Sequence, residues 1–182
     1  MSLPGALPMT RRCFFAAAGL SVAAGAAGAG EHAGEATDLP KAELLSDGEA
    51  KTYLLVFRTG QEVMKGLLAF ARKHKLVAGH LTGIGAVSDA VLGYFDPQTK
   101  SYLRNQEKGQ AEVLSLTGNL ARYNNEPFFH VHVALGRRDG SARGGHLFAA
   151  TARPTAEVVL TVYPKLVRRK IDPETGLPLL GP

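Results

Sequence analysis

Three histidines in the second half of the chain have the type and spacing of metal ligands. His130 and His132 lie in residues 128–133, where alternation along a strand places both imidazoles on one face and the apolar side chains on the other. If the next turn centres on Asp139, residue 132 lies opposite residue 146, and His146 joins the same face. Neutral histidine nitrogen is a good ligand for zinc and related divalent ions, and three such ligands leave one coordination position open.

The same pattern has a second interpretation, in which these histidines form a polar strand face that contacts water or carboxylates. The register match with His146 favours the metal site. We therefore expect a divalent metal, with zinc preferred, to be bound by His130, His132 and His146. The sequence assigns no catalytic residue, because it contains neither a nucleophile elbow nor a phosphate-cradling loop.

Other polar residues are candidates for binding roles. Arg58 at the end of a predicted strand, Glu112 and Asn119 are the side chains expected near any ligand pocket. A basic cluster near the C-terminus is the candidate nucleic-acid-binding surface, and it consists of Lys165, Arg168, Arg169 and Lys170. Such a cluster is also typical of a solvated chain end, so DNA binding is an alternative that we do not favour.

The elements that position these residues follow from the hydrophobic pattern. Residues 52–58 are rich in strand-forming side chains, and apolar positions in 61–75 recur on one helical face, with Thr59 placed to cap the helix. Strand-like runs separated by turn residues follow at 78–87, 90–95, 101–104, 112–120, 128–136, 146–152 and 157–163. The pattern predicts an α+β fold with one long helix packed on a mainly antiparallel β-sheet.

The first part of the chain has the form of an export signal. Arg11 and Arg12 precede an apolar stretch of Ala and Gly that ends in small residues near Ala29. The order Thr-Arg-Arg-x-Phe-Phe resembles a twin-arginine signal. We predict a signal peptide over 1–29, no stable membrane span after its removal and a periplasmic or otherwise exported protein. A non-functional leader would leave the protein in the cytoplasm.

Composition and charge set the limits of the mature domain. Hydrophobic residues make up 45% and charged residues 20% of the chain, which excludes a disordered chain and a multispan membrane protein. The formal net charge is +5, and two of the positive charges lie in the leader. We expect 30–50 to be a mobile lead-in and 51–182 to form a single domain with a C-terminal tail.

Four segments in order are more specific than any one motif. They are TGIGAVSDAVLGYFD, EVLSLTGNLARYNNEPFFHVHVALG, GGHL and TAEVVL. In this combination, residues 51–163 resemble the plants and prokaryotes conserved (PPC) domain, the domain associated with AT-hook DNA-binding proteins, and the chain resembles a stand-alone bacterial member. The resemblance implies an antiparallel sheet, a homotrimer, and metal ligands at His130, His132 and His146 near a subunit boundary.

The leader and the resemblance together predict an exported homotrimer that binds a divalent metal and could take a small-molecule ligand. A DNA-binding or regulatory protein is one alternative, although the chain lacks the Arg-Gly-Arg-Pro core of an AT-hook. A structural scaffold without catalysis, in which the histidines stabilise the trimer, is another. The sequence does not decide whether the protein is an enzyme.

Overall fold

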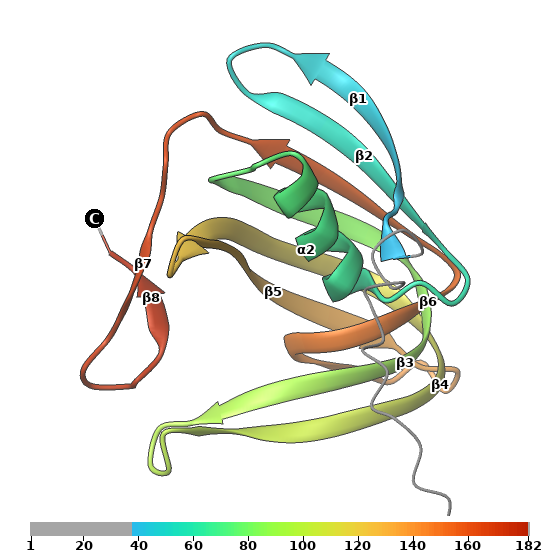
Figure 1. The fold of residues 1–182 in the computed structure, drawn as a ribbon. Helices are drawn as coiled ribbons and strands as arrows, with labels where there is room; N and C mark the ends of the chain where they lie inside the picture. The colour runs from blue at the N-terminus through green and yellow to red at the C-terminus, as the bar shows by residue number, and fades with distance from the viewer. Residues whose placement is uncertain (1–37, 182) are drawn as a thin grey trace, which may run out of the picture. The chain divides into compact units, whose positions relative to one another are not determined.

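A computed structural model describes residues 38–181, and Figure 1 shows how their elements are arranged. The predicted signal peptide over 1–29 lies outside the described residues. The described elements, in chain order, are β1 (Lys41–Asp47), β2 (Lys51–Arg58), α2 (Val63–Lys73), β3 (Gly79–Asp96), β4 (Ser101–Tyr123), β5 (Glu126–Gly136), β6 (Ala142–Val162), β7 (Arg169–Ile171) and β8 (Pro178–Leu180).

Six strands form one antiparallel sheet in the order β1–β2–β6–β3–β4–β5. Strand β6 also pairs with β5, so β3, β4, β5 and β6 close into a ring of four strands. The first half of β6 contacts β5 and the second half contacts β2, which its 21-residue length allows. Strands β7 and β8 form a separate two-stranded hairpin.

Helix α2 packs against β5 and β6 and lies across one face of the sheet (Figure 1). Its apolar face places Leu67 and Phe70 against sheet residues such as Phe57, and all three are at most 2% exposed. Burial of apolar area contributes about 25 cal/mol per Å², so burial of these side chains between helix and sheet stabilises the fold.

The prediction of an α+β fold built on a long helix is wrong, because the structure is mostly antiparallel sheet and α2 has only 11 residues. Glu62, not Thr59, caps its start, and its carboxylate accepts the backbone N–H groups of Met64 and Lys65. Lys75 has a φ of 53°, a left-handed conformation that ends the helical path. The predicted range 61–75 therefore exceeds the helix by two residues at each end.

The predicted short runs merge into longer strands. Strand β3 joins 78–87 to 90–95, β4 joins 101–104 to 112–120, and β6 joins 146–152 to 157–163. On β3 the pairing with β4 shifts register between Gly83 and Gly85 and again between Val87 and Asp89, and the second shift lies at the break expected between 87 and 90. Gly85 has a φ of 133°, and a Cβ there would collide with the Thr155 carbonyl of β6, so glycine is required.

The sheet begins at Lys41, before the expected domain start at residue 51 and within the expected lead-in. Strand β1 pairs with β2, but all seven of its residues are exposed, so it carries no alternating pattern that would reveal a strand. Within residues 38–181, no helix has the length and apolar character needed to cross a membrane.

Candidate metal centre

Strand register brings the three histidines together. His132 of β5 is the direct partner of His146 of β6, which confirms the predicted pairing around a turn at Asp139. His130 lies two residues earlier on β5, opposite Asn119 of β4. His146 also pairs with Gly93 of β3, so all four strands of the ring contribute backbone to the site.

The imidazoles form a compact group. One ring nitrogen from each histidine lies within 4.8 Å of the others, and the Nε2 atoms of His130 and His132 are 3.1 Å apart. A tetrahedral zinc ion with bonds of 2.0–2.1 Å holds its nitrogen ligands about 3.3 Å apart. Small side-chain adjustments would therefore bring all three nitrogens to bonding distance. The donor set fits a divalent ion with affinity for nitrogen.

Burial keeps two of these imidazoles neutral. His130 and His146 are partly buried, whereas His132 is exposed. Burial, together with positive charge on the other histidines, Arg104 and Arg169, lowers the pKa of His146 to about 4. Burial and Arg169 also lower the pKa of His130. The Nδ1 atom of His146 is buried without a hydrogen-bond partner among residues 38–181, so it is available to an ion or ligand.

Arg169 of β7 forms one side of the site. It is 6% exposed, and its guanidinium donates to the Pro178 carbonyl at 2.9 Å and to the Oδ1 atom of Asn119. Its Nε atom is buried and has no partner among residues 38–181. The guanidinium also lies 5.0 Å from the centre of the Phe128 ring. The hairpin of β7 and β8 thus holds a buried cation beside His130.

Aromatic side chains form another side. The rings of Tyr102 and Phe148 lie 5.1 and 4.8 Å from His146, and the Arg104 guanidinium lies 3.9 Å above the Phe148 ring. Gly93 makes this possible, because a Cβ there would lie 2.5 Å from Phe148 and 2.9 Å from Tyr102. The absence of a side chain on β3 therefore opens the space beside His146.

No carboxylate joins the histidine group in the described part of the chain. A divalent ion bound there would add its charge to those of Arg104 and Arg169, since the three imidazoles are neutral ligands. Such a site attracts an anionic ligand, because each negative charge brought beside the ion is favourably compensated.

Of the three residues expected near a ligand pocket, only Asn119 lies close to the histidines. Asn119 lies in the site through its register with His130 and its contact with Arg169. Arg58 is exposed and pairs with Thr155, nine positions from His146 along β6. Glu112 is exposed opposite Gly136, four positions from His132 along β5. The structure does not bring these two side chains to the histidines.

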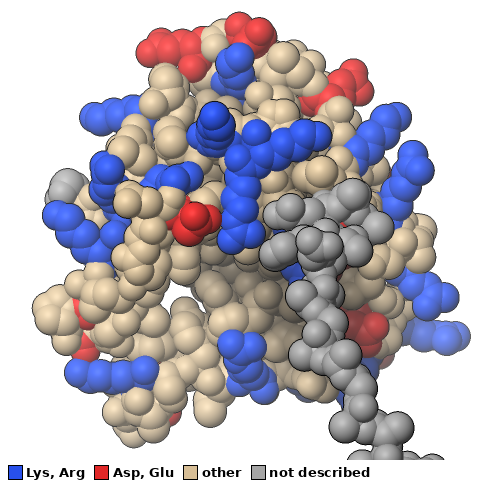
Figure 2. All heavy atoms as spheres, in the orientation of Figure 1, with Lys and Arg blue, Asp and Glu red and all other residues tan. Residues whose placement is uncertain are grey.

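The four basic residues near the C-terminus do not form one surface. Lys165, Arg168 and Lys170 are exposed, but Arg169 is buried beside the histidines. Neighbouring residues of a strand point to opposite sides, so the buried Arg169 alternates with two exposed neighbours. In Figure 2, Lys and Arg side chains are distributed over several parts of the visible face and form no single stripe.

Sequence reasoning missed Tyr102, Arg104 and Phe148. Only the strand register of the structure places Arg104 near His146: Arg104 of β4 pairs with Gly93 of β3, and Gly93 pairs with His146 of β6. This row crosses three strands, and no local motif in the sequence marks it.

The fold and the site define a class of β-rich domains in which three histidines on neighbouring strands form a candidate metal centre. Residues 45–164 match the Plants and Prokaryotes Conserved (PCC) domain, so the chain belongs to this family, as the resemblance predicted. No curated protein sequence matches the chain significantly.

Three solved structures support the fold at about 30% identity. A metal-containing protein from Archaeoglobus fulgidus is 33% identical with a TM-score of 0.67, and the match covers 79% of this chain and 99% of that one. A plant- and prokaryote-conserved protein from Pyrococcus horikoshii is 31% identical with a TM-score of 0.68, covering 78% and 95%. A candidate DNA-binding protein from Bacteroides thetaiotaomicron is 30% identical with a TM-score of 0.70, covering 77% and 96%.

Proposed function

We propose that this protein is an exported homotrimer that binds a divalent metal ion, preferably zinc, and a small anionic ligand beside it. The observation that carries the proposal is the convergence of His130, His132 and His146, whose nitrogens lie within 4.8 Å of one another. Two of the three side chains have a lowered pKa, which favours the neutral form that coordinates metals. A bound zinc ion supplies a Lewis acid with an open coordination position.

The similar protein from Archaeoglobus fulgidus is described as containing metal, and this supports metal binding by this chain. Selection of an anion rests on the two arginines. Arg104 and Arg169 are both close enough to His146 to lower its pKa, and Arg169 keeps a buried Nε donor without a partner among residues 38–181. A carboxylate or other oxyanion would satisfy that donor and the positive charge together.

Export is supported by the twin-arginine pattern at Arg11 and Arg12. Assembly is supported by apolar side chains that the isolated chain leaves in solvent. Tyr94 and Leu103 are direct partners on β3 and β4 and are 63% and 56% exposed. Large exposed apolar groups on adjacent strands are typical of a surface that another subunit covers.

The test is metal analysis of natively exported, untagged protein by mass spectrometry. Because the proposal has a single site, we expect about one zinc per chain in the wild type. We expect none in a variant carrying His130→Ala, His132→Ala and His146→Ala. His80→Ala is the matched control, because His80 is exposed and bonds only to Tyr163 among the described residues. Wild-type stoichiometry in the triple variant would show that the metal binds elsewhere.

Two further measurements separate this proposal from a scaffold or a cytoplasmic protein. Light scattering before and after chelation shows whether metal loss dissociates the assembly, and a scaffold predicts dissociation without any anion binding. Cell fractionation of the wild type and of Arg11→Lys with Arg12→Lys tests export. Detection of wild-type protein only in the cytosol would contradict the export part.

A further inference from the structure

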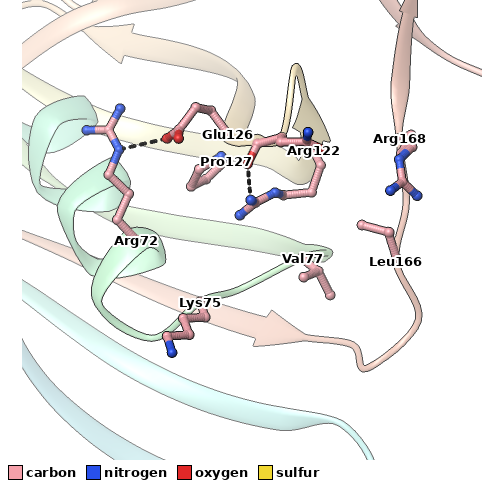
Figure 3. Close-up of a pocket in the computed structure, with 9 residues that line it drawn as sticks. Arg72, Lys75, Val77, Arg122, Glu126, Pro127, Leu166 and Arg168 are labelled. Atoms are coloured by element: carbon pink, nitrogen blue, oxygen red, sulfur yellow. Dashed lines mark hydrogen bonds and ion pairs between the residues drawn. The ribbon is translucent and has the colours of Figure 1, made fainter.

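A cavity of about 490 Å³ opens at the C-terminal end of α2. Its lining comes from the last turn of α2, the loop that follows, the adjoining ends of β4 and β5 with the turn between them, and the segment between β6 and β7 (Figure 3). None of the three histidines lines it. Its size is within the roughly 300–1,000 Å³ that small-molecule sites usually have.

The lining is strongly cationic. It contains four basic side chains, Arg72, Lys75, Arg122 and Arg168, and the single carboxylate of Glu126. Arg72 forms an ion pair with Glu126 at 3.2 Å, and this pair neutralises one cation. Figure 3 shows Arg122 between Arg72 and Arg168 in this view.

The other cations have no acidic partner within residues 38–181. The Arg122 guanidinium donates to the backbone carbonyl of Asn125, a neutral acceptor. Lys75 and Arg168 make no ion pair in this part of the chain. Three uncompensated positive charges therefore border one cavity, and their mutual repulsion favours an anion between them.

The backbone holds two of these cations close together. The Arg122 N–H donates to the Val167 carbonyl at 2.8 Å, and Arg122 and Arg168 form an isolated parallel bridge. Their guanidinium groups thus start from adjacent backbone positions, although the residues are far apart in sequence. Planar guanidinium groups bind phosphate oxygens through paired hydrogen bonds, so two such groups can share one dianion.

Apolar side chains complete the lining. Val77, Pro127 and Leu166 contribute the apolar surface, and the cavity is larger than a bare phosphate needs. From these features we infer that the cavity binds a small phosphomonoester, with the phosphate held by Arg122 and Arg168 and the organic part against the apolar residues. The site is separate from the histidine centre and does not depend on metal.

A small ligand fits the geometry better than a nucleic acid. The cations line a single cavity, whereas a duplex requires cations spread along a backbone path. In Figure 2 the basic side chains are spread over the visible face and are not gathered in one stripe.

The test is calorimetric titration of the mature, metal-loaded protein at low ionic strength, with inorganic phosphate and phenyl phosphate as separate probes. Both are expected to bind, phenyl phosphate more tightly because its ring adds apolar contact. Arg168→Gln and Arg122→Gln should each weaken phenyl phosphate binding about tenfold, since a hydrogen bond to a charged group is worth about 1.5 kcal/mol.

Lys170→Gln is the matched control, because Lys170 is an exposed neighbour of Arg168 on the same segment and does not line the cavity. It should change the dissociation constant less than about twofold, as expected for a distant surface charge. Arg168→Gln should keep the wild-type metal content and unfolding temperature.

Three outcomes would overturn the inference. One is failure of the wild type to bind either probe, and another is unchanged phenyl phosphate binding in both cavity variants. The third is displacement of phenyl phosphate by duplex DNA whose affinity falls steeply with salt and is lost in Arg168→Gln, which would reassign the cavity to nucleic acid. Equal affinity for phosphate and phenyl phosphate would overturn the assignment of an organic part.

Discussion

Among the three candidate ligands, His132 is the one whose removal should disturb packing least, because it is exposed whereas His130 and His146 are partly buried. We predict that His132→Ala lowers zinc affinity by more than the roughly 10–100-fold that loss of a group supporting a ligand costs. The unfolding temperature of the metal-free protein should stay unchanged. Competition with a chromophoric chelator measures the affinity, and a value equal to that of His80→Ala would contradict the role of His132.

A pH-dependent contribution to stability comes from Glu107. Its carboxylate accepts two hydrogen bonds of 2.6 Å from Arg137, and its side chain is 6% exposed. The hydrogen bond and charge of Arg137 lower the pKa of Glu107 below 4.5. A lowered pKa stabilises the folded state above the unfolded-state pKa, and this contribution is lost as the pH falls through the lower, folded-state pKa.

We therefore predict that Glu107→Gln lowers the urea midpoint at pH 7 and that the difference from wild type is smaller at pH 3, because a lowered pKa stabilises the folded state less once the pH is below the unfolded-state pKa. Glu157→Gln, an exposed change on β6, should alter neither value. Urea unfolding at both pH values measures this. A deficit of the same size at pH 3 would assign the effect to packing and not to the ion pair.

At the scale of elements, Glu62 connects the helix to the sheet. Its carboxylate caps α2 and also accepts the backbone N–H of Ala150 in β6 at 2.9 Å. We predict that Glu62→Ala lowers the free energy of unfolding by about 1–3 kcal/mol, since it removes a cap and a bond to a partly buried donor. Thr59→Ala should cost less than about 1 kcal/mol, because the Thr59 hydroxyl donates only to the exposed Pro154 carbonyl. Chemical unfolding measures both variants, and an equal loss of unfolding free energy in Glu62→Ala and Thr59→Ala would contradict the role of Glu62 as the cap.

The histidine site could be predicted because its geometry depends on one local turn. Once Asp139 is taken as the turn centre, strand alternation and antiparallel pairing place His132 opposite His146. The long helix could not be excluded in this way. Its end depends on the left-handed backbone at Lys75, and its start on the contact of Glu62 with β6, neither of which the apolar pattern of 61–75 records.

Residues that reach the site through pairing of strands distant in sequence could not be predicted from the hydrophobic pattern either. Arg104 reaches His146 through Gly93, across two strand pairings with register shifts. The register shift next to Asp89 and the left-handed Gly109 on β4 look like breaks in the sequence, but the strands continue through them. Bulges of this kind lengthen strands without a sequence signal that separates them from turns.

At the scale of the molecule, the segment after β6 contributes residues to both sites. Arg168 borders the phosphomonoester cavity, and Arg169 lies beside His130. The bond from the Arg122 N–H to Val167 and the contact of Arg169 with Asn119 fix this segment against β4. The two sites therefore share one structural support, although their binding residues differ.

The proposed trimer leads to a prediction about its interface. Exposed Tyr94 and Leu103 on adjacent strands would gain roughly 25 cal/mol per Å² of apolar area if another subunit covered them. We predict that Leu103→Glu reduces the molar mass from that of a trimer to that of a monomer in light scattering, because a buried, unpaired carboxylate is strongly unfavourable. Leu45→Glu, on exposed edge strand β1, should leave the mass unchanged. A wild-type mass equal to that of one chain would contradict the homotrimer. A trimer that tolerates Leu103→Glu would have its interface on another surface, because a carboxylate at the contact would lose its hydration without gaining a compensating charge.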